Sequence, residues 1–252
     1  MTPVPAPERV VVAFPPFDYP WDGPGWGSES FTKRGIAHVS VFHRREDWHQ
    51  HGEFVPAMEA LRADLGPGTA ITTYGFSMGG YGALLAAGPL AAERAVAVSP
   101  QASIDPGVVP FERRYHDQWA AMEGWYHAPP GAAEGSRMIV LYDPLHRLDR
   151  THEALLGATT GHRRCLMHGA GHAAIQTMVG MGIIETFFDV LRGRADEGAL
   201  RHAYRGGRRR SFRYLRKVGT VVRKRNSAMA PEFLRLAEEG GFHRLIKKWK
   251  TP

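Results

Sequence analysis

Gly75-Phe76-Ser77-Met78-Gly79 places a serine between two glycines at the point where a strand pattern gives way to a helix pattern. Residues 70–74 before it are β-branched and aromatic, as in a buried strand, and residues 81–87 after it are small and compatible with a helix. A G-x-S-x-G sequence in this context is typical of a sharp turn that exposes a serine hydroxyl at the edge of a sheet. The stretch therefore predicts an α/β fold with Ser77 as a candidate nucleophile.

Short apolar segments recur along the chain, with helical or loop segments between them. They are rich in Val and Ile and do not alternate cleanly, which is typical of strands covered on both faces. They span residues 9–14, 37–42, 69–74, 93–98, 137–142 and 163–168. Between the second and third, residues 54–65 are apolar at helical spacing and end at Gly66-Pro67-Gly68. This order predicts a doubly wound, mostly parallel sheet of about six strands.

The length of 252 residues and the 43% hydrophobic content suit one α/β domain with an appendage. A helix predicted over residues 173–191 closes a domain that we place at residues 1–193. Residues 99–136, between the fourth and fifth strands, are too long for a simple crossover and are rich in aromatic side chains. Because ligands of such sheets bind at the carboxyl ends of the strands, we expect this insertion to form a cap over the site.

A serine hydroxyl is a poor nucleophile near neutral pH, so it needs a base and an acid that orients the base. His172 follows a glycine-rich loop after the sixth strand and is the predicted base, with His168 at the strand end as the alternative. Asp143 directly follows the fifth strand and is the first candidate for the acid. Asp149, six residues later, is the alternative if the turn is longer.

These motifs in this order resemble the α/β-hydrolase superfamily over roughly residues 9–191. Sheets of that family have eight mostly parallel strands, so the resemblance implies that the first two are missing here. It implies an acyl-enzyme mechanism through Ser77, with His172 as base and then acid and Asp143 orienting it. An ester is the expected bond, in a small molecule or an acylated carbohydrate. The same three residues would serve an acyltransferase, and a hydrolase-like protein that only binds is a further alternative.

The resemblance also implies an oxyanion site. One donor is the backbone N–H of Met78, and the other comes from the loop after the first strand. Pro15 and Pro16 in that loop have no N–H, so the second donor is expected to be Phe17 or Asp18.

Aromatic side chains near the strand ends and in the cap are expected to contact substrate, because aromatic faces suit sugar rings and acyl chains. These residues are Phe14, Trp21, Trp26, Phe76, Trp119 and Trp125. No cofactor and no metal are expected. His49 and His51 form a His-x-His pair, but no third ligand stands at metal-binding spacing.

The net charge of +7 is unevenly distributed along the chain. Residues 1–191 hold 14 Lys and Arg against 20 Asp and Glu, whereas residues 192–252 hold 18 against 5. We expect residues 194–252 to form an extension of short basic helices that binds an anionic surface or polymer. Nucleic acid is not expected as a partner, because no nucleic-acid-binding motif accompanies the charge.

Three observations predict a cytoplasmic protein. The single cysteine, Cys165, lies in a predicted buried strand and excludes an internal disulfide. Residues 1–7 show no basic cluster followed by an apolar run. No segment reaches the roughly 18 apolar residues that a membrane span requires.

Overall fold

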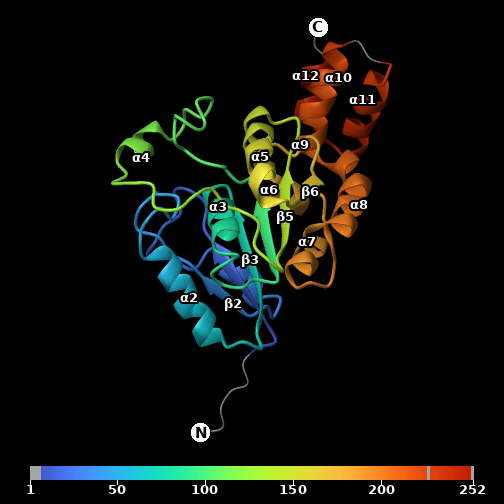
Figure 1. Cartoon of the computed structure of the whole chain (residues 1–252). Coiled ribbons are helices and arrows are strands. Elements are labelled where there is room, and N and C mark those ends of the chain that lie inside the picture. The colour runs from blue at the N-terminus through green and yellow to red at the C-terminus, as the bar shows by residue number, and fades with distance from the viewer. Residues whose placement is uncertain (1–6, 226–227, 251–252) are drawn as a thin grey trace.

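The computed structural model describes residues 7–225 and 228–250. The initial residues that bear on a targeting signal, 1–6, lie outside this part. A single six-stranded, all-parallel sheet has the order β2-β1-β3-β4-β5-β6 (Figure 1). Its strands are β1 (Arg9–Phe14), β2 (His38–Ser40), β3 (Ala70–Phe76), β4 (Arg94–Val98), β5 (Arg137–Tyr142) and β6 (Arg163–Leu166). Each predicted strand segment overlaps one of these strands, which confirms the doubly wound parallel sheet.

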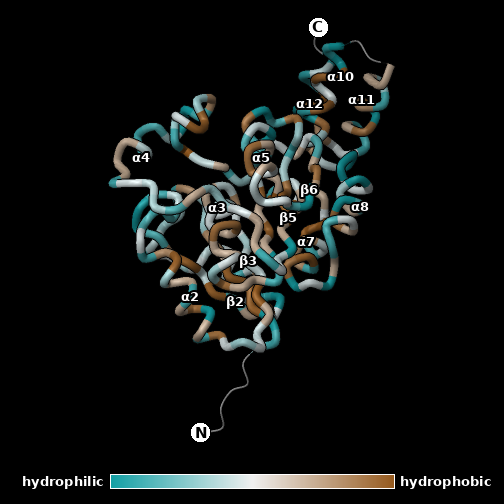
Figure 2. The backbone as a smooth tube through the Cα atoms, in the orientation of Figure 1, coloured by the Kyte–Doolittle hydropathy of each residue, from teal (hydrophilic) through white to brown (hydrophobic). Residues whose placement is uncertain are grey.

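Helices cover both faces of the sheet. Alternate residues of each strand point to opposite faces, and both sets are apolar, so both faces are buried under helices. In β1, Val10 and Val12 belong to the hydrophobic cluster that includes α2 (Phe54–Leu65), α3 (Met78–Leu85) and α5 (Arg147–Thr160). Val11 and Ala13 belong to the opposite cluster with α1 (Ser28–Thr32), α6 (Ala174–Gly180) and α7 (Ile184–Leu191). Figure 2 shows hydrophobic residues along the central strands and hydrophilic ones along the outer loops.

The predicted helix over residues 173–191 is divided into α6 and α7. Gly182, between them, has φ 71°, a left-handed conformation that glycine adopts without steric cost. The apolar spacing continues through both helices, which is why the sequence pattern suggested one. The turn allows Phe187 and Phe188 of α7 to pack in the core beside α1.

The insertion between β4 and β5 is mostly irregular and contains one short helix, α4 (His116–Ala120). In Figure 1 it projects beyond α3 at the upper left. Its Ile104 and Tyr115 pack with Met78 and Tyr81 of α3 in a separate hydrophobic cluster. The buried His152 of α5 anchors the insertion: its Nδ1 accepts from Ala102 N at 3.2 Å and its Nε2 donates to the Glu112 carboxylate at 3.0 Å.

The C-terminal extension follows α7 as a series of short helices, as predicted. They are α8 (Glu197–Gly207), η1 (Arg208–Arg210), α9 (Phe212–Tyr214), the π-helical turn η2 (Leu215–Gly219), α10 (Thr220–Lys224), α11 (Ala230–Glu239) and α12 (His243–Lys250). Helix α8 packs against β6, and Figure 1 shows the others continuing beyond that edge of the sheet. Leu200, Leu215 and Trp249 belong to the same hydrophobic cluster as the strands. The excess of acidic residues gives way to an excess of basic ones near residue 193, but the hydrophobic core continues from the sheet into the extension.

Among the described residues, no helix is long and apolar enough to cross a membrane. The cytoplasmic location stays a prediction.

Candidate active site

Ser77 lies in a strained turn between β3 and α3. Its backbone has φ 56° and ψ −119°, a region that non-glycine residues rarely adopt. Gly75 and Gly79 make the turn possible, since a Cβ on Gly75 would overlap the backbone of Gly79. The Ser77 N–H donates to the Val98 carbonyl of β4 at 2.9 Å. The turn therefore holds the serine side chain at the carboxyl end of the sheet.

His172 lies between Ser77 and Asp149. Its Nε2 is 3.1 Å from Ser77 Oγ, and its Nδ1 is 2.8 Å from Asp149 Oδ1. An ionised carboxylate only accepts hydrogen bonds, so Nδ1 carries the proton and Nε2 is free to accept the serine proton. Ser99 Oγ donates to the His172 carbonyl at 3.0 Å, which fixes the backbone of the histidine.

Asp149 is buried in the first turn of α5, with 2% exposure. Burial raises the pKa of its carboxyl, but hydrogen bonds with His146 and His172 outweigh this and hold the pKa well below its usual range. The carboxylate is therefore charged near neutral pH and can stabilise an imidazolium at His172.

The structure corrects the expectation that Asp143 orients His172. Asp143 is fully buried, and its two oxygens accept hydrogen bonds from other groups. These donors are the N–H groups of Leu145, Gly169 and Gly171 and the ammonium of Lys217. Asp143 thus braces the loop before His172. The carboxylate that reaches the imidazole is the alternative, Asp149, because the chain turns after β5 and starts α5 beside the histidine.

His168, the alternative base, has different contacts from His172. Its carbonyl accepts from the Tyr204 hydroxyl at 2.9 Å, and burial lowers the pKa of its imidazole. His49 is fully enclosed between Phe14 and Phe54, and burial lowers its pKa to about 3.

One group among the described residues has the spacing to hold a metal ion. It consists of His146, Asp149 and His172, whose ligand atoms all lie within 4.8 Å of one another. A metal there would occupy Nδ1 of His172 and replace its hydrogen bond to Asp149. These residues can therefore either keep the hydrogen bond between His172 and Asp149 or hold a metal ion, but not both at once.

Two further residues reach Ser77 and were missed from the sequence. Gln101, which is 1% exposed, donates from Nε2 to Ser77 Oγ at 2.8 Å. The Tyr115 hydroxyl also interacts with Ser77, and burial raises the pKa of Tyr115, so this hydroxyl stays neutral. Gln101 follows β4, the neighbour of β3, so its place after a central strand was the available signal. For Tyr115, no sequence signal other than its position in the cap was available.

The expected oxyanion donors are the N–H groups of Met78 and of Phe17 or Asp18. Met78 is the first residue of α3, so its N–H has no acceptor within the helix. The Asp18 N–H donates to Glu46 Oε1 at 2.8 Å, which leaves Phe17 as the candidate of that loop. The Phe17 ring packs against Tyr115, with ring centroids 5.4 Å apart. Both oxyanion assignments stay predictions.

A scan of family models and a search of curated proteins give no match to this chain. Among solved structures, the chain is similar to the capsule O-acetyltransferase of Neisseria meningitidis serogroup A, with a TM-score of 0.50 and 14% identity over 74% of this chain and 88% of that one. The single six-stranded parallel sheet with helices on both faces is consistent with an α/β-hydrolase fold. A metagenome-derived lipolytic enzyme gives a TM-score of 0.44 at 13% identity over 74% of this chain and 94% of that one. An α/β serine hydrolase without a lid from Xanthomonas campestris gives 0.41 at 16% over 81% and 84%.

An apolar pocket of about 390 Å³ lies beside Phe76, the last residue of β3. Phe76 and Trp26 line it, together with side chains of α1, α6 and α7. Phe76 also contacts His172, with ring centroids 5.1 Å apart, and Trp26 stacks on Tyr74 at 4.8 Å. Of the aromatic residues expected to contact substrate, Phe76 is therefore the one that packs against the histidine.

The other aromatic residues of that set have different surroundings. Phe14 is fully buried and points into the core beneath α2 and α3, which corrects its assignment to the substrate site. Trp119 and Trp125 pack on each other in the cap cluster at 5.5 Å. Trp21 is 53% exposed, and the Arg44 guanidinium lies 4.8 Å above its ring.

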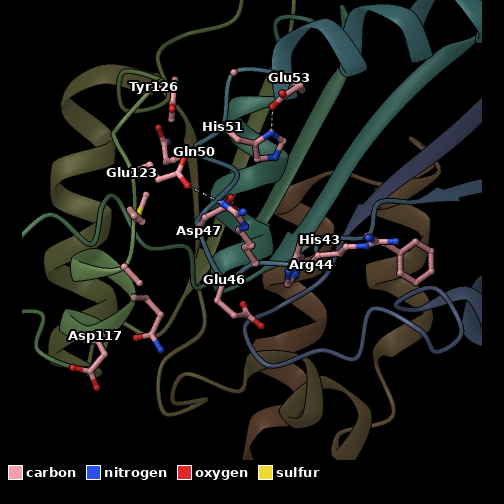
Figure 3. A pocket seen from close by; sticks show the side chains of 16 residues that line it. His43, Arg44, Glu46, Asp47, Gln50, His51, Glu53, Asp117, Glu123 and Tyr126 are labelled. Carbon is pink, nitrogen blue, oxygen red and sulfur yellow. Dashed lines mark ion pairs between the residues drawn. The ribbon is translucent and has the colours of Figure 1, made fainter.

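A larger, charged cleft of about 880 Å³ separates the loop after β2 from the cap (Figure 3). Figure 3 shows Arg44, Glu46 and Asp47 on one side and Asp117 and Glu123 on the other. An ion pair of 3.6 Å between Arg45 and Glu123 spans it. The lining residues do not include Ser77, so the cleft does not contain the candidate nucleophile.

Proposed function

We propose that this protein is a serine hydrolase that cleaves an ester through an acyl-Ser77 intermediate. The observation that carries the proposal is the position of the His172 imidazole, 3.1 Å from Ser77 Oγ and 2.8 Å from Asp149 Oδ1. Both distances are within the range required for proton transfer and for orientation of the base.

In this mechanism, Ser77 Oγ attacks the ester carbonyl while His172 Nε2 removes its proton. Asp149 stabilises the imidazolium, which then protonates the leaving alcohol. The Met78 N–H, and that of Phe17, would stabilise the oxyanion. Water enters next, gives a proton to His172 Nε2 and attacks the acyl carbon. The bond between Ser77 Oγ and the acyl carbon then breaks, His172 returns the proton to Ser77 Oγ, and the carboxylic acid product leaves. Gln101 and Tyr115 hold the hydroxyl ready for attack.

We assign the acyl chain of the substrate to the apolar pocket behind Phe76. The pocket lies beside the histidine and is lined mainly by aromatic and aliphatic side chains. Each methylene buried there contributes about 0.8 kcal/mol, so KM should fall as the acyl chain lengthens until the pocket is filled. A series of p-nitrophenyl esters from acetate to decanoate measures this dependence.

Acyl transfer is the second candidate, and two observations favour it. Ser77 is only 4% exposed beneath the cap, which limits access of water to an acyl-enzyme. The solved structure with the highest similarity score given above is an O-acetyltransferase. The charged cleft between the β2 loop and the cap would then receive a hydroxyl-rich acceptor such as a carbohydrate. Added oligosaccharide that diverts the acyl group from water would identify this activity.

The test of both candidates is labelling of Ser77 by a fluorophosphonate probe, with Ser77→Ala as the control. Labelling of the native protein and not of the variant, together with p-nitrophenyl ester turnover, supports the proposal. A folded native protein that shows neither labelling nor turnover contradicts it and favours the alternative of a hydrolase-like binding protein.

The predicted anionic partner of the extension also stays a proposal. Several of its cations are paired within the molecule, such as Arg235 with Glu232 and Lys250 with Glu238. Arg210, Arg213 and Arg216 are exposed beside the partly exposed Phe212 and are the cations we assign to it. Replacing these three arginines by Gln should weaken salt-sensitive binding to anionic liposomes or polymers, and unchanged binding would contradict the assignment.

A further inference from the structure

The loop that carries His172 is braced by a buried carboxylate. Asp143 has no exposed surface, and its Oδ1 accepts from the Gly169 N–H at 2.9 Å. Its Oδ2 accepts from the Gly171 N–H at 2.8 Å. Gly171 immediately precedes His172. These hydrogen bonds therefore set the course of the backbone that brings the imidazole to Ser77.

The counter-charge of Asp143 comes from the C-terminal extension. Lys217 Nζ lies 2.6 Å from Asp143 Oδ2, although the two residues are 74 positions apart in the sequence. Lys217 belongs to η2, a π-helical turn, and π-turns often accompany functional sites. A buried carboxylate without an opposite charge beside it is unfavourable. The ammonium thus allows Asp143 to remain an acceptor for the loop.

The extension also contacts the loop directly. The Tyr204 hydroxyl of α8 donates to the His168 carbonyl at 2.9 Å. Gly169 has φ 81° and lies so close to α9 and η2 that a Cβ on it would be 2.8 Å from both Tyr214 and Val218. The loop is therefore enclosed between the strand that supplies Asp143 and the extension.

We propose that Lys217 is a positioning residue for the catalytic histidine, so that the extension is a working part of the active site. Lys217 holds the ionised Asp143, Asp143 holds Gly169 and Gly171, and the loop places His172 against Ser77. This inference rests on the proposed hydrolase function and gives the extension a role independent of any anionic partner.

Loss of the lysine charge has a specific consequence at the histidine. In Lys217→Met the Asp143 carboxylate, bonded to the N–H of Gly171 next to His172, keeps its negative charge without the ammonium that balances it. A net negative charge at this loop favours the positively charged form of His172. Protonated His172 cannot act as the base, so the acid limb of the activity profile should move to higher pH. A variant that only loosens the fold would lower activity without moving this limb.

The experiment compares Lys217→Met and Lys217→Arg with Lys224→Met, which replaces an exposed lysine of the same extension. Esterase kcat and KM are measured from pH 5 to 9, with the rate of fluorophosphonate labelling and the melting temperature. For Lys217→Met we expect kcat to fall about tenfold, KM to stay within about twofold, and the acid limb to rise by about half a pH unit. Lys217→Arg should recover most of the rate, and Lys224→Met should match the native protein.

The native protein must first label at Ser77, because failure there contradicts the hydrolase proposal and not this inference. If the native protein labels and Lys217→Met keeps its kcat and acid limb, the positioning role is excluded. A loss of rate without a pH shift and without rescue by Lys217→Arg assigns Lys217 a merely structural role. If Lys217→Met does not fold, Tyr204→Phe removes one contact with the same loop, and its unchanged labelling rate would contradict the proposal.

Discussion

The carboxylate of Asp149 is expected to be the most sensitive partner of His172. Asp149→Asn would remove the charge that stabilises the imidazolium and permit the wrong tautomer, so kcat for ester hydrolysis should fall roughly 10³- to 10⁴-fold with little change in KM. Asp64→Asn, at an exposed position of α2, is the matched control. Because the pKa of Asp149 lies well below its usual range, the acid limb of native kcat/KM should follow a single protonation. If Asp149→Asn kept more than a tenth of the native kcat, the assignment of Asp149 as the partner of His172 would be contradicted.

Gln101 contacts the nucleophile directly, from the segment that enters the cap. Gln101→Leu keeps the side-chain size but removes the hydrogen bond of 2.8 Å to Ser77 Oγ. We expect kcat to fall about 10- to 100-fold, as for the loss of one polar contact at a reacting oxygen. Gln101→Glu, with a carboxylate facing the hydroxyl, should fall further. Labelling of Ser77 at the native rate in both variants would remove Gln101 from the mechanism.

The contact between α3 and β1 depends on the glycines of the elbow. A Cβ on Gly79 would overlap the backbone carbonyls of Phe14 and Pro15, so Gly79→Ala should lower the free energy of unfolding by about 3 kcal/mol. Gly206→Ala in α8 is the control, since its Cβ meets nothing within 4 Å and should add about 0.5–1 kcal/mol of stability. Urea unfolding measures both, and equal effects of the two substitutions would contradict this account.

Elements with strong local patterns were predicted well from the sequence. Helix α2 has the predicted bounds, and each predicted strand segment overlaps a strand. Residues 173–191 were less predictable, because their apolar spacing continues across the turn at Gly182. The cap was expected from its length and aromatic content. The contact that anchors the cap was not expected, because the hydrogen bond between Glu112 and His152 joins residues 40 positions apart.

The stability of the whole molecule should depend on pH through the buried His49. Its pKa is about 3 in the folded protein against 6.5 for an ordinary histidine, so the unfolded chain binds one more proton between these values. This group's contribution is fully present above pH 6.5 and is lost as the pH falls, by about 1.4 kcal/mol per pH unit. Urea unfolding at pH 7, 6 and 5 should show a shallower dependence for His49→Gln. The exposed control His202→Gln should keep the native slope, and an unchanged slope in His49→Gln would contradict the prediction.

The sequence by itself determined the parallel sheet, the elbow at Ser77 and the histidine loop, because these depend on periodicity and on residues close together along the chain. Only the tertiary structure decided which carboxylate meets His172 and where Asp143 finds its counter-ion. Asp149 and His172 are 23 positions apart, and Lys217 is 74 positions from Asp143. Such pairs form only when the turn after β5 and the helices of the extension pack against the sheet, and no local pattern specifies that packing.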